Sequence, residues 1–348
     1  MKGLDRYANR SVAVVVPDAT RPFDYARLGP LLDGLIGVEA RPRIVVALGL
    51  HRPMTDGELR PLVAASRGVP VVQHDAATSA TISEHVTSAD AVICVGLVEP
   101  HQYAGFSGGI KTVSIGCASA AAIAQSHGLW SVADSRVAIG RVEDNPFQAM
   151  LWSRAAALED VWALQVVPGD PAVEFFGPVR ETFARAAALA GEVCFERWDA
   201  PKPWLRMTVP GAKAKSFYQA SRAATYVALH PRPAVAAGGM LVVEAGCEEG
   251  IGRGAGEVAF ARALRRGRDV LVEELRAQER VISGGEQRAY VLVRALELAR
   301  IVVVGAPLMP ELASVGVEQV DRFEALGLRE AEGVNVEDVF RRVPCVRG

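Results

Sequence analysis

The sequence predicts an α/β protein of two domains, each with a mostly parallel sheet, and an active site in the cleft between them. Its 348 residues are 50% hydrophobic, which is enough for two cores. Short runs rich in β-branched residues alternate with helical patterns, as is typical of parallel sheets. Polar turns follow several of these runs, at the strand ends where ligands bind in such sheets.

The first domain is expected over residues 1–200 and the second over 204–326. Between them Trp198–Pro203 contains two prolines, which block regular pairing and indicate a linker. The last residues, 327–348, are expected to contain a helix at Arg329–Arg342 that joins the first domain.

Elements of the first domain follow from apolar runs and capping patterns. The expected strands are Ser11–Pro17, Arg43–Gly49, Pro70–Gln73, Asp90–Gly96, Arg136–Gly140 and Val161–Val167. The expected helices run from Pro22 to about Ile36, from a Thr55/Glu58 capping box, through an alanine-rich stretch to about Ser126, and over Pro178–Ala190.

Elements of the second domain follow by the same patterns. The expected strands are Leu205–Val209, Gly239–Ala245 and Ile301–Gly305. The expected helices are Ala212–Ala224, Glu257–Arg265, Val270–Glu279 and Glu286–Ala299.

Composition excludes several classes of protein. The net charge is −2 and the charges are dispersed, so neither a nucleic-acid groove nor a basic membrane face is expected. Five widely spaced cysteines without a CxxC pair indicate reduced thiols, a cytoplasmic protein and no structural zinc. No apolar run has the length of a signal peptide or of the roughly 20 residues in a membrane span.

Lys111 ends a glycine-rich turn and is one of only five lysines among 38 basic residues. Where arginine is used almost everywhere else, a lysine suggests a need for its amine. The turn is not a P-loop, because Ile110 and not glycine precedes the lysine. A tight turn that ends in a solvated lysine is the alternative.

Three polar clusters follow strands: Asp18–Arg21, His51–Arg52 and the stretch from His101. Parallel strands bring their carboxyl ends to one edge, so these clusters are expected to converge. Arg21 is suited to bind a carboxylate or phosphate, although the first cluster is also consistent with a helix-capping turn.

Histidines at strand ends often act as acid–base groups, which favours His51 and His101. His127 ends a helix before Gly128 and is either a helix-end partner or a metal ligand. A single histidine is a poor metal site, so a metal here needs other donors. No role is assigned to the remaining histidines, His74, His85 and His230.

Tyr218, Gln219 and Arg222 share one helix face in the second domain, which indicates either an anion site or a solvated surface. Gly250–Gly256 has spacing like that of a dinucleotide loop, but lacks an acidic residue in a second strand. A flexible loop is therefore the favoured interpretation of that stretch.

Taken in order, DATRP, GLHRP, HQYAGFSGGIK, a histidine sixteen residues past that lysine, and YQASR resemble the lactate racemase family of nickel-pincer enzymes. The resemblance extends over nearly the whole chain. It implies a nickel-pincer nucleotide attached covalently through Lys111, with His127 as the protein ligand to nickel. Proteins that build and deliver this cofactor are the implied partners. The implied cofactor contacts are Asp18, Thr20, Arg21, Ser107 and Gly108.

The implied reaction inverts the hydroxyl-bearing carbon of a lactate-like 2-hydroxy acid by reversible hydride transfer. His51 and His101 match the two acid–base positions of the family. Substrate carboxylate or cofactor phosphate would be bound by Arg21, Tyr218, Gln219 and Arg222.

Arginine at 222 departs from the family, where lysine is common, so the substrate can differ from lactate. An epimerase of a sugar acid or larger hydroxy acid therefore stays open. A dehydrogenase using NAD and a non-catalytic carrier of nickel or cofactor are the alternatives from other classes.

Overall fold

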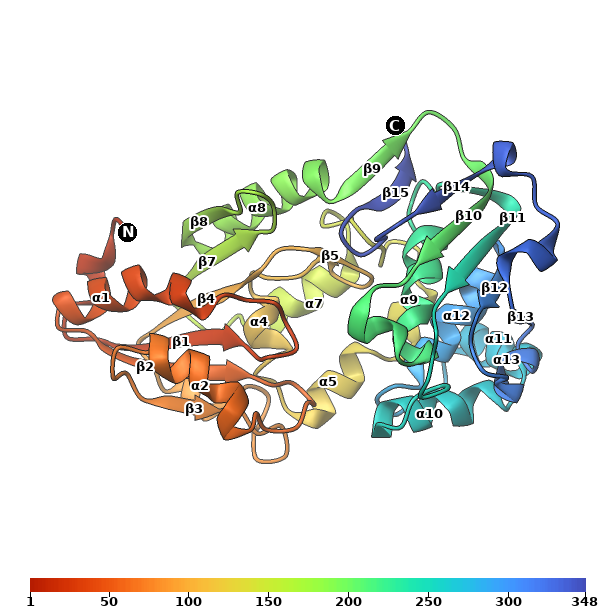
Figure 1. Ribbon diagram of the computed structural model, residues 1–348. Helices are drawn as coiled ribbons and strands as arrows, with labels where there is room; N and C mark the ends of the chain where they lie inside the picture. Colours follow the sequence, from red (N-terminus) through yellow and green to blue (C-terminus); the bar gives the residue numbers. More distant parts are fainter. The chain divides into compact units, whose positions relative to one another are not determined.

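The computed structural model describes all residues, 1–348, and divides into two compact units. The first unit comprises residues 1–126 and 142–192, and the second comprises 127–141 and 193–348. Each unit contains a mostly parallel sheet with helices, which confirms the predicted α/β fold class (Figure 1).

The sheet of the first unit has the strand order β3-β2-β1-β4-β7-β8 and is parallel except at β8. Its strands are β1 (Ser11–Pro17), β2 (Arg41–Ala47), β3 (Val71–Gln73), β4 (Ala91–Leu97), β7 (Val161–Val167) and β8 (Val173–Pro178). The central strands β1 and β4 are buried almost throughout, as their continuous apolar sequences predict.

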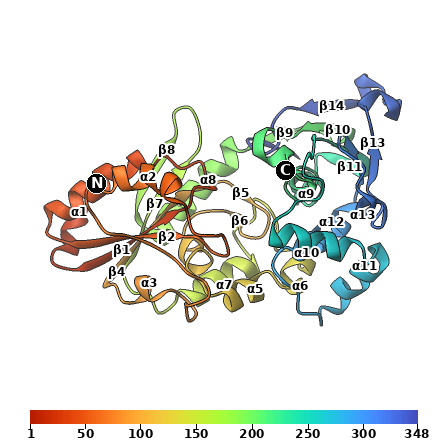
Figure 2. The same cartoon turned by 60° about the horizontal axis from the view of Figure 1, so that its bottom comes forward.

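Helices cover both faces of this sheet. Figure 2 shows α1 (Gly29–Gly37) and α2 (Asp56–Ala65) on one side, and α3 (Glu84–Thr87) and α7 (Pro146–Arg154) on the other. The further elements of the unit are η1 (Leu4–Tyr7), η2 (Tyr25–Leu28), β5 (Pro100–His101), β6 (Gly105–Phe106), α4 (Lys111–Ser114), α5 (Ala120–Ser126) and α8 (Val179–Val193). One core cluster packs between the sheet and α1, around Leu31, Leu32 and Leu35.

The strand order reverses at β1, because the chain adds β2 and β3 on one side of it and then β4 on the other. Ligands bind at such switch points in doubly wound sheets. The turns after β2, β1 and β4 carry the three polar clusters predicted from the sequence, so the topology places these clusters at one edge.

The second unit contains a five-stranded parallel sheet of order β13-β12-β11-β10-β14 and a separate pair, β9 with β15. The strands are β9 (Phe195–Trp198), β10 (Lys202–Thr208), β11 (Val235–Glu244), β12 (Arg300–Val304), β13 (Glu318–Val320), β14 (Gly333–Val336) and β15 (Val343–Val346). Its helices are α6 (Leu129–Ala133), η3 (Gly211–Ala214), α9 (Phe217–Ala228), α10 (Ala255–Leu264), α11 (Arg268–Ala277), α12 (Gln287–Leu296), α13 (Pro310–Ala313), η4 (Phe323–Leu326) and η5 (Glu330–Glu332). No helix of the chain combines the length and apolar composition of a membrane span.

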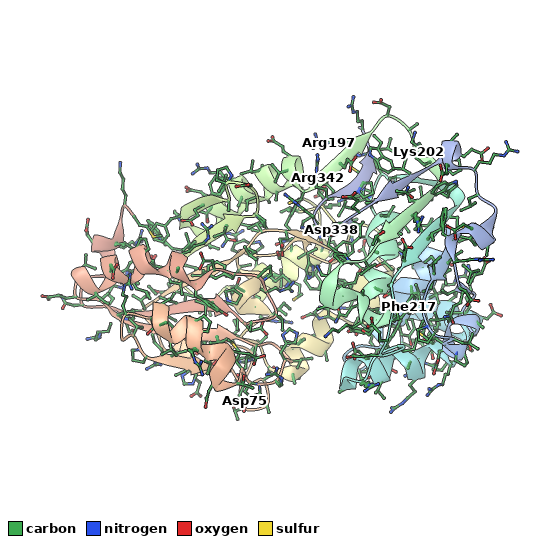
Figure 3. All side chains as sticks on the ribbon, viewed as in Figure 1. Asp75, Arg197, Lys202, Phe217, Asp338 and Arg342 are labelled. Carbon is green, nitrogen blue, oxygen red and sulfur yellow. The ribbon has the colours of Figure 1, made fainter.

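The predicted C-terminal helix is wrong. Residues 327–348 belong to the second unit, where β14 pairs with β10 and β15 pairs with β9. Asp338 lies between these strands (Figure 3). Its side chain accepts hydrogen bonds from the backbone N–H of Phe340 and of Arg341, which forms a turn. Strand pairing over Gly333–Val336 outweighs the local helical pattern.

Two other predictions need correction. Residues 136–140 form turns and not a strand, because the Asp134 carboxylate accepts the Arg136 backbone N–H at 2.8 Å. The first helix begins later than Pro22, since Asp24 caps η2 by accepting the Ala26 N–H at 3.0 Å.

Candidate active site

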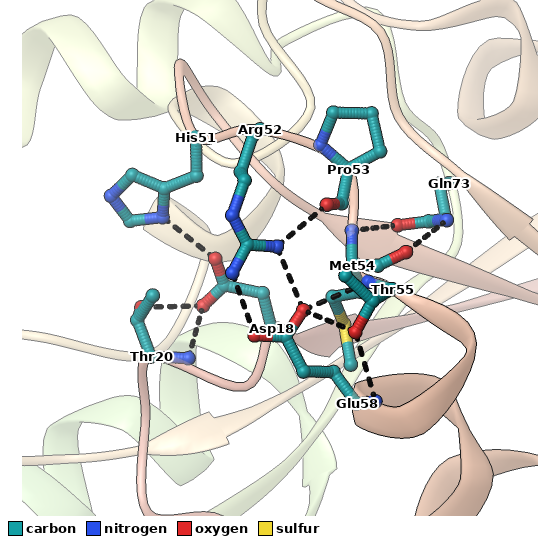
Figure 4. Close-up of polar contacts among 9 residues, drawn as sticks. All are labelled: Asp18, Thr20, His51, Arg52, Pro53, Met54, Thr55, Glu58 and Gln73. Carbon is teal, nitrogen blue, oxygen red and sulfur yellow. Dashed lines mark hydrogen bonds and ion pairs between the residues drawn. The ribbon is translucent and has the colours of Figure 1, made fainter. Parts of the chain in front are cut away.

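A hydrogen-bonded pair of Asp18 and His51 lies at the carboxyl ends of β1 and β2. Asp18 is 4% exposed, whereas the side chain of His51 is 56% exposed. Asp18 Oδ2 and His51 Nδ1 are 2.6 Å apart (Figure 4). The other carboxylate oxygen, Oδ1, accepts hydrogen bonds from the hydroxyl and the amide of Thr20, at 2.6 and 3.2 Å.

These contacts decide the charge on Asp18 and the orientation of His51. Burial acts to raise the pKa of Asp18, but the hydrogen bonds from His51 and Thr20 outweigh it and hold the pKa below its ordinary value. An ionised carboxylate only accepts, so His51 donates its Nδ1–H and, when neutral, has its lone pair on Nε2. His51 is thereby arranged to act as a general base through Nε2.

Arg52, the residue after His51, fixes the turn that carries His51. Arg52 makes two hydrogen bonds of 2.8 Å to the Glu58 carboxylate. Glu58 also accepts the Thr55 N–H at 2.8 Å, completing the predicted capping box at the start of α2 (Figure 4). Arg52 is therefore committed to the loop, and of the two adjacent residues His51 is the one available for chemistry.

His101 lies in the β5–β6 hairpin and has the opposite tautomer. The backbone N–H groups of Tyr103 and Ala104 both donate to His101 Nδ1, at 3.2 and 3.1 Å. A nitrogen that accepts two N–H groups carries no proton, so neutral His101 is protonated at Nε2. The resemblance implies two acid–base groups, His51 and His101. In this geometry neutral His51 has its lone pair on Nε2, whereas neutral His101 has its proton there.

Lys111 is the first residue of α4, directly after the glycine turn. Gly108 and Gly109 have φ angles of +83° and +54°, which favour glycine. A Cβ on Gly108 would lie 2.4 Å from Gln165 Oε1, the same oxygen that accepts the Gly109 N–H at 2.8 Å. The packing of Gly108 and Gly109 against Gln165 therefore fixes the glycine turn that precedes Lys111.

Two of the predicted cofactor contacts have hydrogen bonds inside the chain. Thr20 donates to Asp18, as described above. The Ser107 hydroxyl donates to the Leu97 carbonyl at 2.8 Å and accepts the Glu99 N–H at 3.0 Å. Ser107 therefore holds the loop after β4 together.

Arg21 is exposed, and its guanidinium makes no hydrogen bond or ion pair within the chain. The Asp18 carboxylate, which follows the same strand, binds His51 and not the Arg21 guanidinium. Arg21 touches Asp18 only through the backbone, where its N–H donates to the Asp18 carbonyl at 3.1 Å. Its fork of donors remains suited to a carboxylate or phosphate.

Side chains of this protein do not form a metal site by themselves. No group of three or more His, Cys, Asp or Glu residues lies close enough to hold a metal ion. All five cysteines are buried thiols, and burial raises the pKa of Cys94 to about 12 and helps raise that of Cys247 to about 11.

The second unit contains the predicted anion-binding residues. Tyr218, Gln219 and Arg222 are half-buried on α9, with Tyr218 and Arg222 one turn apart. His127, also half-buried, is the first residue of the segment that the second unit takes from the middle of the chain.

Arg288, for which the sequence suggests no role, is a buried cation on α12. It is 8% exposed, its Nε and Nη1 have no hydrogen-bond partner, and its guanidinium lies 5.0 Å from the Tyr218 ring centroid. A cation–π contact contributes about 0.5–2 kcal/mol, whereas burying an uncompensated charge costs several kcal/mol. The local sequence gives no signal for it, because a charged residue on an amphipathic helix ordinarily lies on the exposed face; the packing of α12 buries Arg288.

Asp18→Asn is expected to lower the free energy of unfolding by about 2 kcal/mol at pH 7, because a buried charge-assisted hydrogen bond is lost. The folded-state pKa of Asp18 is depressed, so this contribution is full above about pH 4 and disappears as pH falls through that pKa. Urea unfolding at pH 7 and pH 2 measures the difference. Asp33→Asn, which removes an exposed ion pair with Arg67, is the control. Equal effects of Asp18→Asn at both pH values would contradict the assignment.

Comparison with known proteins identifies the region that carries the site. The lactate racemase N-terminal domain family matches residues 3–140, which include Asp18, His51, His101 and Lys111. Residues 3–140 of the chain therefore match a lactate racemase N-terminal domain. The resemblance inferred from the motifs is thus confirmed.

Two lactate racemases are similar to the chain in sequence. The lactate racemase of Thermoanaerobacterium thermosaccharolyticum is 27% identical over 181 residues, covering 45% of this chain and 42% of that protein. The lactate racemase of Lactiplantibacillus plantarum is 31% identical over 136 residues, covering 34% and 32%. The matched region therefore spans less than half of either relative.

Structural similarity to the lactate racemase fold extends further. The lactate racemase apoprotein of T. thermosaccharolyticum superposes with a TM-score of 0.86 at 22% identity, covering 100% of this chain and 89% of that one. A protein of Thermotoga maritima has a TM-score of 0.70 at 15% identity, covering 99% and 97%. At these identities the comparison establishes the fold.

Proposed function

We propose that this protein is an isomerase that racemises or epimerises the hydroxyl-bearing carbon of a 2-hydroxy acid. The observation that carries the proposal is the Asp18–His51 pair, which lies in the region matched by the lactate racemase N-terminal domain. The reaction class comes from the two relatives, which are named lactate racemase.

His51 takes the hydroxyl proton of the substrate at Nε2. Asp18 holds the imidazole in the required tautomer and stabilises the imidazolium that forms. His101 donates a hydrogen bond from Nε2 to a substrate oxygen. To serve as a second base, His101 would first have to break its bonds to the amides of Tyr103 and Ala104.

Two arginines and a glutamine are assigned to anion binding. The exposed guanidinium of Arg21 and the residues Gln219 and Arg222 on α9 are suited to hold the substrate carboxylate or a cofactor phosphate.

The residues fit a nickel-pincer nucleotide joined through Lys111, with His127 as the protein ligand to nickel. The Lys111 amine offers a covalent bond that arginine cannot form. The lack of a cluster of metal donors in the chain means that such a metal must arrive with ligands of its own. When bound, the cofactor would supply a reversible acceptor for the hydride on C2.

The test uses protein produced together with the enzymes that build the cofactor. Single enantiomers of 2-hydroxy acids labelled with deuterium at C2 are incubated with it, and chiral chromatography and mass spectrometry follow the products. We expect loss of optical purity with the deuterium retained, since a transferred hydride does not exchange with water. Exchange of the label would indicate proton abstraction from C2, and unchanged configuration of every substrate would refute the isomerase. Protein made without the cofactor enzymes is the control.

The dinucleotide-binding alternative loses support at Gly250–Gly256. The Glu257 carboxylate accepts the backbone N–H groups of Arg253 and Gly254 at 2.7 and 2.8 Å. These amides at the start of α10 are among those that a pyrophosphate would use, and the glutamate already occupies them with negative charge.

A further inference from the structure

Arg288 is a buried cation that no carboxylate of the chain neutralises. The nearest glutamate in sequence, Glu286, binds Arg280 and also accepts hydrogen bonds from the amide and hydroxyl of Ser283. Glu257, in the first turn of α10, accepts a hydrogen bond from the Ser216 hydroxyl and caps the helix. These carboxylates are committed elsewhere, and none of the ion pairs of the protein involves Arg288.

The surroundings of Arg288 hold its guanidinium in place. Its central carbon lies 5.0 Å from the centroid of the Tyr218 ring, and that ring packs edge-on against Phe260 with centroids 5.4 Å apart. The backbones of Gly285 and Gly256 touch so closely that a Cβ on Gly285 would lie 2.0 Å from the Gly256 carbonyl oxygen. The loop before α12 and the first turn of α10 are therefore packed together beside Tyr218.

The contact with Tyr218 leaves Nε and Nη1 of Arg288 without hydrogen-bond partners. A planar fork of N–H donors matches the oxygens of a carboxylate. Arg222 lies one turn along α9 from Tyr218, so the second unit has a second guanidinium on the same helix as the ring that Arg288 contacts. Two such groups suit a ligand with two acidic groups better than a ligand with one.

We infer that Arg288 binds a second carboxylate of the substrate, so that the substrate is a dicarboxylic 2-hydroxy acid. The inference rests on the function proposed above and narrows its substrate class. A monocarboxylic acid such as lactate would leave the buried charge of Arg288 without a counter-ion.

Binding to the full-length protein without cofactor tests the site by calorimetry with three probes: 2-hydroxysuccinate, lactate and inorganic phosphate. For Arg288→Met we expect at least tenfold weaker binding of 2-hydroxysuccinate and less than a twofold change for lactate. Arg288→Lys should fall between wild type and Arg288→Met, since it keeps the charge but loses the fork. Arg276→Met, at an arginine whose side chain is 78% exposed on α11, is the control. Equal losses for both acids, or an Arg288-dependent preference for phosphate over 2-hydroxysuccinate, would overturn the inference.

Thermal unfolding separates a binding role from a structural one. Replacing an unneutralised buried charge by an apolar side chain of similar volume is often neutral or stabilising. We therefore expect Arg288→Met to keep or raise the Tm of the cofactor-free protein. A Tm lowered by several degrees would assign Arg288 to the fold and overturn the inference.

Turnover separates this inference from the proposed function. Rapid racemisation of lactate that Arg288→Met leaves unchanged would uphold the isomerase and remove the second carboxylate. Arg288-dependent binding of 2-hydroxysuccinate without inversion of any acid would support the anion site and refute the isomerase.

Discussion

Lys111→Arg is expected to abolish covalent attachment of the cofactor and, with it, all racemisation. An arginine at the start of α4 keeps the positive charge but lacks the amine that the covalent link requires. Intact-mass measurement of protein produced with the cofactor-building enzymes should show the adduct in the wild type and none in the variant. Digestion should place the wild-type adduct on the peptide that contains Lys111. The undigested wild-type protein should also contain nickel.

Lys215→Arg is the matched control, because Lys215 is exposed and lies far along the chain in the second unit. It should carry the adduct in wild-type yield. An adduct of equal yield on Lys111→Arg protein would show that another residue is the point of attachment. Circular dichroism of the Lys111→Arg protein tests whether misfolding causes the loss of the adduct.

His51→Ala is expected to lower kcat by about 10²–10⁴-fold, the usual contribution of a general base. The adduct on Lys111 should remain, since the proposal gives His51 no part in attachment. Asp18→Asn should lower kcat less, because His51 keeps its imidazole but loses the carboxylate that holds its tautomer.

His85→Ala is the control, at an exposed histidine outside the site. A His101→Ala loss equal to that of His51→Ala would indicate that His101 also transfers a proton, despite its two amide donors. Retention of turnover in His51→Ala protein would refute the role of the Asp18–His51 pair.

The strands that position the site could be predicted from local sequence. Ser11–Pro17 is apolar on both faces, and the structure makes it a central strand with these bounds. Its polar successor Asp18 therefore had to lie at a strand end. By contrast, residues 333–336 became a strand only because β10 offers a free edge, with Leu205 opposite Val334. A local helical pattern cannot foresee a partner more than a hundred residues away.

By itself the sequence determined which reactive groups the protein has and that they follow strands: an amine at Lys111, imidazoles at His51 and His101, and a carboxylate at Asp18. The tertiary structure decided their partners. Parallel pairing sets Pro17 opposite Ala47, and this register brings Asp18 to His51 across 33 positions of sequence. It also buried Arg288 beside Tyr218. Hydrogen bonds and burial depend on strand register and helix packing, which join distant segments, whereas chemical identity belongs to each residue alone.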